Sequence, residues 1–155
     1  MRVKDVMTSD VKHCSLDTNL AAAAKIMWEG DCGAVPVTDD QGKVVGMITD
    51  RDICIAGATR SRAAGEIAVR DVISRTLHAC APGDDVRAAM DTMKRQQVRR
   101  LPVTGQDGRL AGIVSIHDIA LQARPSKGSD VRVEDVLDTF IAITAPARPH
   151  LAASA

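Results

Sequence analysis

Two short segments combine a hydroxyl side chain with a carboxylate three residues later, and each follows a run of apolar residues. The segments are Thr49-Asp-Arg-Asp52 and Ser115-Ile-His-Asp118. A helix that begins at the hydroxyl residue presents free backbone N–H groups and a positive dipole end, which together attract an anion. A carboxylate three residues further on can accept hydrogen bonds from the two hydroxyls of a ribose. The pattern therefore suits a nucleoside phosphate, with these four residues as candidate ligands.

The same spacing also has a purely structural interpretation. Thr/Ser-x-x-Asp is a capping box, in which the hydroxyl and the carboxylate satisfy the N–H groups at the start of their own helix. The direction in which Asp52 and Asp118 point discriminates between the two hypotheses, because a capping carboxylate folds back and a binding one faces a cleft. A glycine three residues before each hydroxyl, at Gly46 and Gly112, and the repeat that contains both favour binding.

These segments belong to an internal repeat, which indicates how they are positioned. A shift of 66 residues aligns Val3–Ile53 with Val69–Ile119 without a gap, and 14 of the 51 aligned pairs are identical. Three consecutive identities fall at Pro-Val-Thr, residues 36–38 and 102–104. Identities in that arrangement are not expected by chance, so the chain carries two copies of one structural unit.

Each copy shows the same order of predicted elements. A short apolar stretch precedes a helix start at Asp17-Thr18 or Asp84-Asp85, and apolar residues then recur at helical spacing. Two short strands follow, separated by a turn rich in Asp and Gly, and a second helix begins at Thr49 or Ser115. The predicted fold class is mixed α/β (α+β), with two tandem β-α-β-β-α repeats.

The predicted boundaries follow from the repeat and from shifts in composition. They are a first repeat at 1–57, a linker at 58–68, a second repeat at 69–122, a loop and C-terminal helix at 123–144, and a flexible tail at 145–155. Five apolar residues fall on one face of that C-terminal helix, which we expect to pack on the pair. They are Val133, Val136, Leu137, Phe140 and Ile141.

Composition excludes several classes of function. The 155 residues contain 20 basic and 20 acidic side chains and only two aromatic ones, Trp28 and Phe140. A duplex-DNA binder usually has a basic excess and a single-strand binder needs aromatic rings, so no nucleic-acid partner is predicted. No apolar stretch approaches the roughly 18 residues of a membrane span, and the N-terminus does not resemble a signal peptide. We expect a cytoplasmic protein whose four cysteines stay reduced.

Metal binding and catalysis find little support. His13-Cys14 and His78-Ala-Cys80 occupy matching places in the two repeats, but their spacing is not a recognised zinc pattern. The chain also lacks the GxSxG, HExxH, Walker and GxGxxG motifs. We therefore predict no metal, no catalytic residue and no enzymatic activity.

The combined pattern resembles a pair of cystathionine β-synthase (CBS) domains, also called a Bateman module. It comprises two Val-x-Asp-Val starts, two hydrophobic-Pro-Val strands and two Gly-hydrophobic-hydrophobic-Thr/Ser-x-x-Asp-Ile junctions, and covers residues 1 to about 122. The layout is most similar to short stand-alone bacterial CBS-pair proteins, some of which respond to stress or hypoxia. The resemblance implies two domains packed about a pseudo-twofold axis, and usually a homodimer shaped as a flat disc.

The resemblance further implies a regulatory module that binds an adenosyl compound in clefts between the repeats. The expected ligands are AMP, ADP or ATP, with S-adenosylmethionine and NAD as further members of this class. Asp52 and Asp118 match the ribose-binding aspartates, and Thr49 and Ser115 match the hydroxyls that contact ribose or phosphate.

Two basic residues indicate where the phosphates of such a ligand would bind. Arg99 and Arg100 match positions where nucleotide-binding members of the family place phosphate ligands, whereas the first copy has Gly33 and Ala34 there. Asp118 is the expected aspartate partner of this arginine pair, although Asp52 could serve the same cleft. The alternative is an exposed strand start at which both arginines pair with carboxylates.

Two further residues complete the candidate site. Family members place adenine against the first strand of each repeat, here Val11–Ser15 and Leu77–Ala81, so His78 is a candidate ligand residue. Arg51 either reaches phosphate or forms a salt bridge with a neighbouring chain. The rival hypothesis is a ligand-free CBS pair that acts as a protein-interaction or stress-response module through a separate regulated protein.

Overall fold

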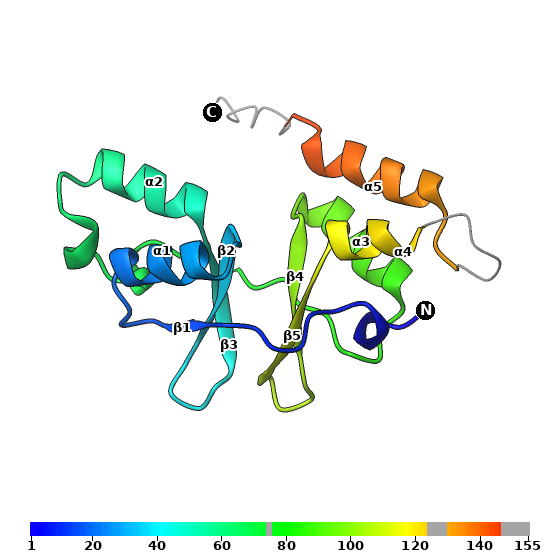
Figure 1. Cartoon of the computed structure of the whole chain (residues 1–155), viewed down its shortest axis with the longest axis horizontal. Helices are drawn as coiled ribbons and strands as arrows, with labels where there is room; N and C mark the ends of the chain where they lie inside the picture. Colours follow the sequence, from blue (N-terminus) through cyan, green and yellow to red (C-terminus); the bar gives the residue numbers. More distant parts are fainter. Residues whose placement is uncertain (74–75, 124–129, 147–155) are drawn as a thin grey trace, which may run out of the picture.

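The computed structural model describes residues 1–73, 76–123 and 130–146, which form two small α+β units placed side by side (Figure 1). The first unit contains β1 (Cys14–Ser15), α1 (Leu20–Glu29), β2 (Ala34–Thr38), β3 (Val44–Thr49) and α2 (Asp50–Thr59). The second contains α3 (Val86–Gln96), β4 (Arg100–Thr104), β5 (Leu110–Ser115) and α4 (Ile116–Gln122), and is followed by α5 (Val133–Thr144). Single 3-10 turns lie at η1 (Val3–Asp5), η2 (Ala64–Glu66) and η3 (Val69–Asp71).

The sheets confirm the predicted repeat. In the first unit the strand order is β1-β2-β3, with β1 parallel and β3 antiparallel to β2. In the second unit β4 pairs with β5 in the same register, so that Val37 faces Gly46 and Val103 faces Gly112. The first strand of the second copy is reduced to one parallel bridge between Cys80 and Val103.

Polar side chains fix where the helices begin. Thr49 and Ser115 are the N-caps of α2 and α4, as predicted from their spacing to an aspartate. The start of α1 was predicted too early. Its N-cap is Asn19, whose Oδ1 accepts the Ala22 N–H at 2.9 Å, because an amide oxygen caps a helix as well as a carboxylate does.

The Val-x-Asp-Val start of each repeat packs against the other repeat. The Val3 N–H donates to the carbonyl of Asp84 at 2.9 Å, and the Val69 N–H donates to the carbonyl of Thr18 at 2.8 Å. Val3 is fully buried in the core of the second unit and Val69 in the core of the first. The start segment of each repeat therefore packs into the core of the other repeat, and this reciprocal packing joins the two units.

The hairpin tips make the second connection between the units. The Val44 N–H donates to Gly108 and the Leu110 N–H donates to Gly42, at 3.1 and 3.3 Å. Both glycines have φ near +77°, a conformation that other residues rarely adopt, so the turns can approach each other closely. The opposite ends of β2 and β4 are left apart, next to the starts of α2 and α4.

The orientation predicted for the C-terminal helix was wrong. The face that was expected to pack is mostly solvent-exposed in α5, with Leu137 at 56% and Ile141 at 58%, while Thr139 and Ile143 face α3 and α4. Polar anchors fix this rotation: Gln97 Nε2 donates to the carbonyls of Ala142 and Ala145, at 3.2 and 2.9 Å. The Thr139 hydroxyl donates to the Asp135 carbonyl at 2.7 Å, which allows a polar side chain to be buried.

The tail predicted at 145–155 lies, from residue 147 on, outside the described residues. Among the helices of the described ranges, none is long and apolar enough to span a bilayer.

Candidate functional site

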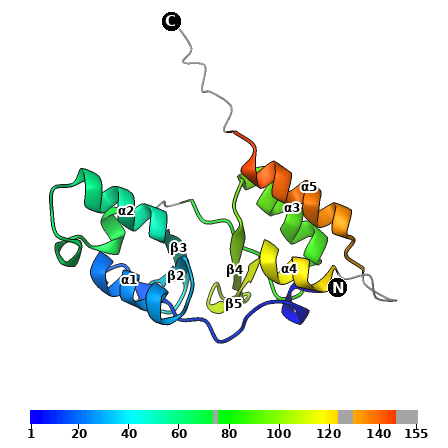
Figure 2. The same cartoon turned by 45° about the horizontal axis from the view of Figure 1, so that its top comes forward.

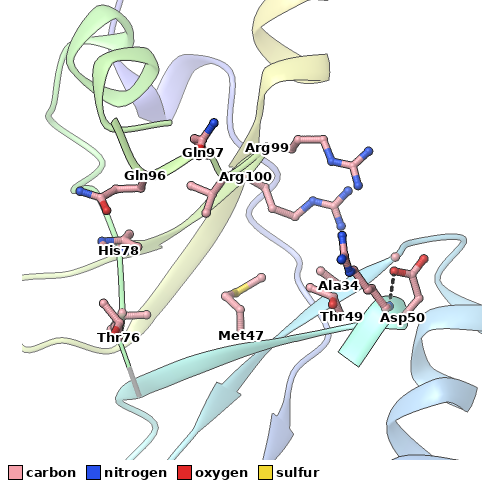
Figure 3. Close-up of a pocket in the computed structure, with 14 residues that line it drawn as sticks. Ala34, Met47, Thr49, Asp50, Thr76, His78, Gln96, Gln97, Arg99 and Arg100 are labelled. Carbon is pink, nitrogen blue, oxygen red and sulfur yellow. Dashed lines mark hydrogen bonds between the residues drawn. The ribbon is translucent and has the colours of Figure 1, made fainter. Parts of the chain in front are cut away.

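A cavity of about 520 Å³ lies between the two units, at the ends of the sheets that the hairpin tips do not close (Figure 3). Its walls come from β2, β3 and the start of α2 on one side, and from the end of α3 and the start of β4 on the other. The lining residues are Gly33, Ala34, Met47, Thr49, Asp50, Arg51, Thr76, Leu77, His78, Gln96, Gln97, Val98, Arg99 and Arg100. A volume of this size is typical of small-molecule sites.

Three arginines from both units dominate the charge of this cavity. Arg51 comes from the first turn of α2, and Arg99 and Arg100 come from the start of β4. Figure 3 shows the side chains of Arg99 and Arg100 extending toward the start of α2, where Thr49 and Asp50 lie. In the described part of the chain no carboxylate or hydrogen-bond acceptor pairs with these three guanidinium groups. The site is therefore suited to an anion, which would supply the missing acceptors.

The backbone of α2 does not contribute the free N–H groups that we expected. The Thr49 N–H donates to Asp52 at 2.9 Å, the Asp50 N–H to the Gly33 carbonyl at 3.1 Å, and the Arg51 N–H to Asp50 Oδ1 at 2.7 Å. The Asp52 N–H donates to Thr49 Oγ1 at 3.2 Å. Because these donors are already used, positive charge in the cleft comes from the guanidinium groups.

Both motif aspartates fold back onto their own helices. Asp52 Oδ2 accepts from the backbone N–H and the hydroxyl of Thr49, at 2.9 and 2.7 Å. Asp118 Oδ2 accepts from the same two groups of Ser115, at 2.8 and 2.7 Å. Each pair is thus a complete capping box. Neither aspartate lines the cavity, and neither does Ser115.

Sequence reasoning missed Asp50, the one acidic residue among those that line the cavity. Its Oδ2 lies so close to Gly33 that a Cβ built on that glycine would be 2.9 Å away. The equivalent position in the second repeat is Ile116, which is buried. A search for charged residues that differ between the repeats would have found this position.

Residues before α3 form the wall opposite α2. Thr76 and His78 lie there with Gln96 of α3, across from Met47 (Figure 3), and Leu77 also lines the cavity. The His78 side chain is half-buried, which agrees with a place beside a bound molecule.

The cysteine next to this wall is a structural residue. Burial raises the pKa of Cys80 to about 11, and it raises the pKa of Cys14 in the first repeat to the same value. Thiols with such values are protonated at neutral pH. Within the described ranges, no three His, Cys, Asp or Glu side chains gather as a metal site.

The structure therefore brings together five of the eight candidate residues. Thr49, Arg51, His78, Arg99 and Arg100 line one cavity. Asp52 caps α2 directly behind Thr49, while Ser115 and Asp118 occupy the pseudo-symmetric position at the start of α4.

The fold and the cleft define a class of protein: a tandem pair of α+β repeats with a ligand-sized cavity between them. A sequence model described as the CBS domain matches residues 3–58 and 69–123 of the chain. The chain belongs to the CBS domain family, and it is a CBS-pair regulatory module.

Comparisons with individual proteins agree with this assignment. The chain is 37% identical over 119 residues to the CBS domain-containing protein YhcV of Bacillus subtilis, covering 77% of this chain and 83% of that protein. It is 36% identical over 122 residues to Hypoxic response protein 1 of Mycobacterium tuberculosis, covering 76% of this chain and 81% of that protein.

Solved structures show the same architecture. Hypoxic Response Protein I, crystallised with two coordinated zinc ions, superposes with a TM-score of 0.71 at 31% identity, covering 78% of this chain and 98% of that one. The CBS domain pair of the protein MJ0100, in complex with 5′-methylthioadenosine and S-adenosyl-L-methionine, gives a TM-score of 0.71 at 25% identity. That match covers 78% of this chain and 94% of the MJ0100 pair, so an adenosyl ligand is bound by a CBS pair of similar fold.

Proposed function

We propose that this CBS pair is a non-catalytic sensor that binds an adenine nucleotide, AMP, ADP or ATP, in the cleft between its repeats. The observation that carries the proposal is the convergence of Arg51, Arg99 and Arg100 on one cavity, with no acceptor for their guanidinium groups among the described residues. Three cations in one cleft repel each other, and a phosphate chain removes this repulsion while accepting several charge-assisted hydrogen bonds.

Each wall of the cleft has a proposed role. The arginines bind phosphate, and the apolar side chains of Met47, Leu77 and Val98 enclose the adenine together with His78. Among the described residues that line this cavity there is no Phe, Tyr or Trp, so the base is held by aliphatic contacts and by the imidazole ring of His78.

The ribose is assigned to the start of α2. Asp52 uses Oδ2 for its capping box, and Oδ1 has no hydrogen-bond partner among the described residues. Because Asp52 is not among the residues that line the cavity, we assign Thr49 to a ribose hydroxyl and give Asp52 the role of holding the Thr49 hydroxyl in place.

A ligand that contacts both units acts as a regulator through its position. It stabilises the arrangement of the two repeats in which Arg51 of the first and Arg99 of the second both reach its phosphates. More molecules therefore adopt this arrangement when the ligand is bound. The regulated protein is then a separate chain that distinguishes the two arrangements.

Isothermal titration with AMP, ADP, ATP and S-adenosylmethionine tests the proposal. We expect the dissociation constant to fall from AMP to ADP to ATP, as the number of phosphates in the ligand rises. Added salt is expected to weaken ATP binding more than AMP binding, because salt screens charge pairs. S-adenosylmethionine, which carries positive charge, is expected to bind least well. Absence of binding by all four compounds at millimolar concentration would overturn the proposal.

A second candidate function is a ligand-free interaction module, in a stress response or elsewhere. It is favoured by the two capping boxes, which give Asp52 and Asp118 a structural role without any ligand. The titration separates the two candidates, because only the sensor binds a nucleotide.

A further inference from the structure

One residue belongs both to the wall of the cleft and to the anchoring of the C-terminal helix. Gln97 lines the cavity, and its side-chain nitrogen Nε2 donates to the carbonyl oxygens of Ala142 and Ala145, at 3.2 and 2.9 Å. In Figure 3 this nitrogen points away from Met47 on the opposite wall. Figure 2 shows the end of α5 beside the end of α3, where Gln97 lies. The cleft and α5 therefore share a side chain.

The last turn of α5 needs hydrogen-bond donors from elsewhere in the chain. The final four carbonyl groups of a helix have no partner within it, and a residue in the left-handed conformation or a basic side chain commonly supplies the missing donors. The last turn of α5 contains no basic residue, and Ala145 follows it with a φ of −56° and a ψ of 140°, which is not left-handed. An amide nitrogen carries two N–H groups, so Gln97 caps α5 from outside the helix.

A second contact connects the same two parts of the molecule. Val98 lines the cavity and packs against the core of the second unit, which includes Ile143 on the buried face of α5. The beginning of α5 is held differently, by residues outside the cavity wall. Arg87 donates to the Asp130 carbonyl at 2.7 Å and pairs with Asp135 at 3.9 Å. It is thus the C-terminal turn of α5 that is connected to the cleft.

The first repeat has the same backbone turn but not this connection. The 66-residue shift relates Gln97 to Asp31, and both residues have a left-handed backbone, with φ of 51° and 46°. Asp31 lines a groove between α1 and α2 rather than the cleft, and a carboxylate has no N–H to offer to carbonyl groups. Among the described residues, the first unit has no α-helix besides α1 and α2. The amide therefore occurs in the repeat that carries the additional helix.

The turn at Gln97 also determines where the arginine pair begins. A left-handed backbone is unfavourable for a residue with a side chain, and it persists only where surrounding contacts hold it. The Gln97 N–H donates to the carbonyls of Met93 and Lys94, and the side chain adds the two bonds to α5. Arg99 and Arg100 follow two and three positions later. Releasing the end of α5 thus removes two of the bonds that fix the turn before these arginines.

We propose that Gln97 is a positioning residue that couples the C-terminal helix to nucleotide binding, a proposal that rests on the nucleotide site proposed above. When the end of α5 is anchored, the turn at Gln97 holds Arg99 and Arg100 in the cleft. When it is released, both arginines gain freedom that binding must remove. A nucleotide therefore binds the anchored state more tightly, and an anchored α5 raises the affinity for nucleotide by the same factor. The end of α5 then presents a surface that changes with the occupancy of the cleft.

Two isoleucines on α5 provide a matched test of this coupling by titration calorimetry with ATP. Ile143 is 9% exposed on the buried face of α5, whereas Ile141 is 58% exposed, and neither lines the cavity. We expect Ile143→Ala to raise the dissociation constant of ATP roughly fivefold or more, and Ile141→Ala to leave it unchanged. Circular dichroism verifies that each variant is folded, and Ile143→Val is the milder substitution if Ile143→Ala does not fold.

A double-mutant cycle separates positioning by Gln97 from a direct contact of its side chain with the ligand. Gln97→Met keeps the length of the side chain and removes its N–H groups. We expect Gln97→Met to weaken ATP binding, and Ile143→Ala to have no further effect in this background, because the connection to α5 is already broken. Independent, additive effects of the two substitutions would overturn the coupling.

Hydrogen–deuterium exchange of residues 139–145 gives a readout at the helix itself. Without nucleotide, we expect faster exchange in Gln97→Met than in the wild type. ATP is expected to slow exchange of this segment in the wild type and not in Gln97→Met. If ATP bound with the expected dependence on Arg99 and Arg100 but left this segment unchanged, the coupling would be wrong and the nucleotide site would stand. Absence of ATP binding by the wild type would instead overturn the nucleotide site, and the coupling with it.

Discussion

The two repeats agree in the residues that build the fold and differ in the residues that line the cleft. Their capping boxes have the same hydroxyl-to-carboxylate distance of 2.7 Å, and their hairpins share one register. At the start of the hairpin, however, Gly33 and Ala34 stand opposite Arg99 and Arg100 in the 66-residue alignment. A duplicated unit thus keeps its structural residues in both copies, and its specific chemistry rests on positions where the copies have diverged.

The same difference explains why the proposed site needs both repeats. The first repeat contributes Thr49, Asp50 and Arg51 from the start of α2, while the second contributes the arginine pair at β4. Small residues at 33 and 34 leave room on one wall, and the guanidinium groups of the other wall extend across toward it (Figure 3). Neither repeat alone has the complete set.

The largest expected effect comes from removing the divergent arginines. A hydrogen bond to a charged group contributes about 1.5–3 kcal/mol, so Arg99→Ala/Arg100→Ala is expected to weaken ATP binding roughly 100-fold or more. Titration calorimetry measures the change, and Arg95→Ala serves as the control, because Arg95 is exposed on α3 outside the cavity. Unchanged affinity in the double variant would show that the phosphates bind elsewhere.

A second prediction concerns the contact between the N-terminal segment and β5, which Gly112→Ala is expected to disrupt. A Cβ at Gly112 would lie 2.6 Å from the carbonyl oxygen of Thr8 and 3.0 Å from the Met7 sulfur. Since the backbone at Thr8 is held by two hydrogen bonds to Ile113, it cannot move away cheaply. We expect Gly112→Ala to lower the free energy of unfolding by about 2–3 kcal/mol in urea.

Gly57→Ala is the matched control for this substitution. Gly57 lies in α2, and a Cβ there would meet no atom within 4 Å. Alanine is the better helix former, so this variant is expected to be as stable as the wild type or slightly more stable. If both alanine variants were equally stable, Gly112 would not mark a close contact between the start segment and β5.

Third, the two capping boxes are expected to respond alike to mutation. Asp52→Ala and Asp118→Ala each remove one carboxylate that satisfies a helix start, and each is expected to cost about 1 kcal/mol of stability. Thermal unfolding of both variants measures this cost. A marked difference in stability between the two variants would indicate that one of the aspartates does more than cap its helix.

The smallest effect concerns the matching thiols Cys14 and Cys80. Burial raises the pKa of each to about 11 from an ordinary value of 9.0, so the folded state disfavours the thiolate. This contribution to stability is complete below pH 9 and is lost as the pH rises toward 11, because only the unfolded chain ionises in that window. In the wild type the urea midpoint is expected to be highest at pH 7, slightly lower at pH 9, where half of these thiols are ionised in the unfolded chain, and lowest at pH 10.5. Cys14→Ala/Cys80→Ala, compared in the same way, should show a smaller fall at pH 10.5.

Local features were predicted well from the sequence, since they depend on residues a few positions apart. The helix starts at Thr49 and Ser115, the hairpins and the repeat itself all follow from short-range spacing. The exchanged starts at Val3 and Val69 could not be predicted in this way. The two segments are so similar, Val-Lys-Asp-Val and Val-Arg-Asp-Val, that the sequence does not indicate which repeat each one packs against.

The candidate site was predicted in part for the same reason. Arg99, Arg100 and Thr49 carry their own signal, as a charged pair and a helix cap. Asp50 was missed because it stands at an unspecified position of the Thr-x-x-Asp motif, and its place in the cleft depends on contact with Gly33. The outward face of α5 was misassigned because an apolar stripe does not reveal which surface covers it.

Hydrogen–deuterium exchange of the wild-type protein with and without ATP tests the central claim most directly, namely that one site is built from both repeats. We predict slower exchange in three separate segments: residues 47–53 at the start of α2, residues 76–78 before α3, and residues 96–101 at the start of β4. Apart from the end of α5, the remaining described backbone should change little. Protection confined to one repeat, or centred on residues 115–118, would contradict a shared cleft lined by Arg51, Arg99 and Arg100.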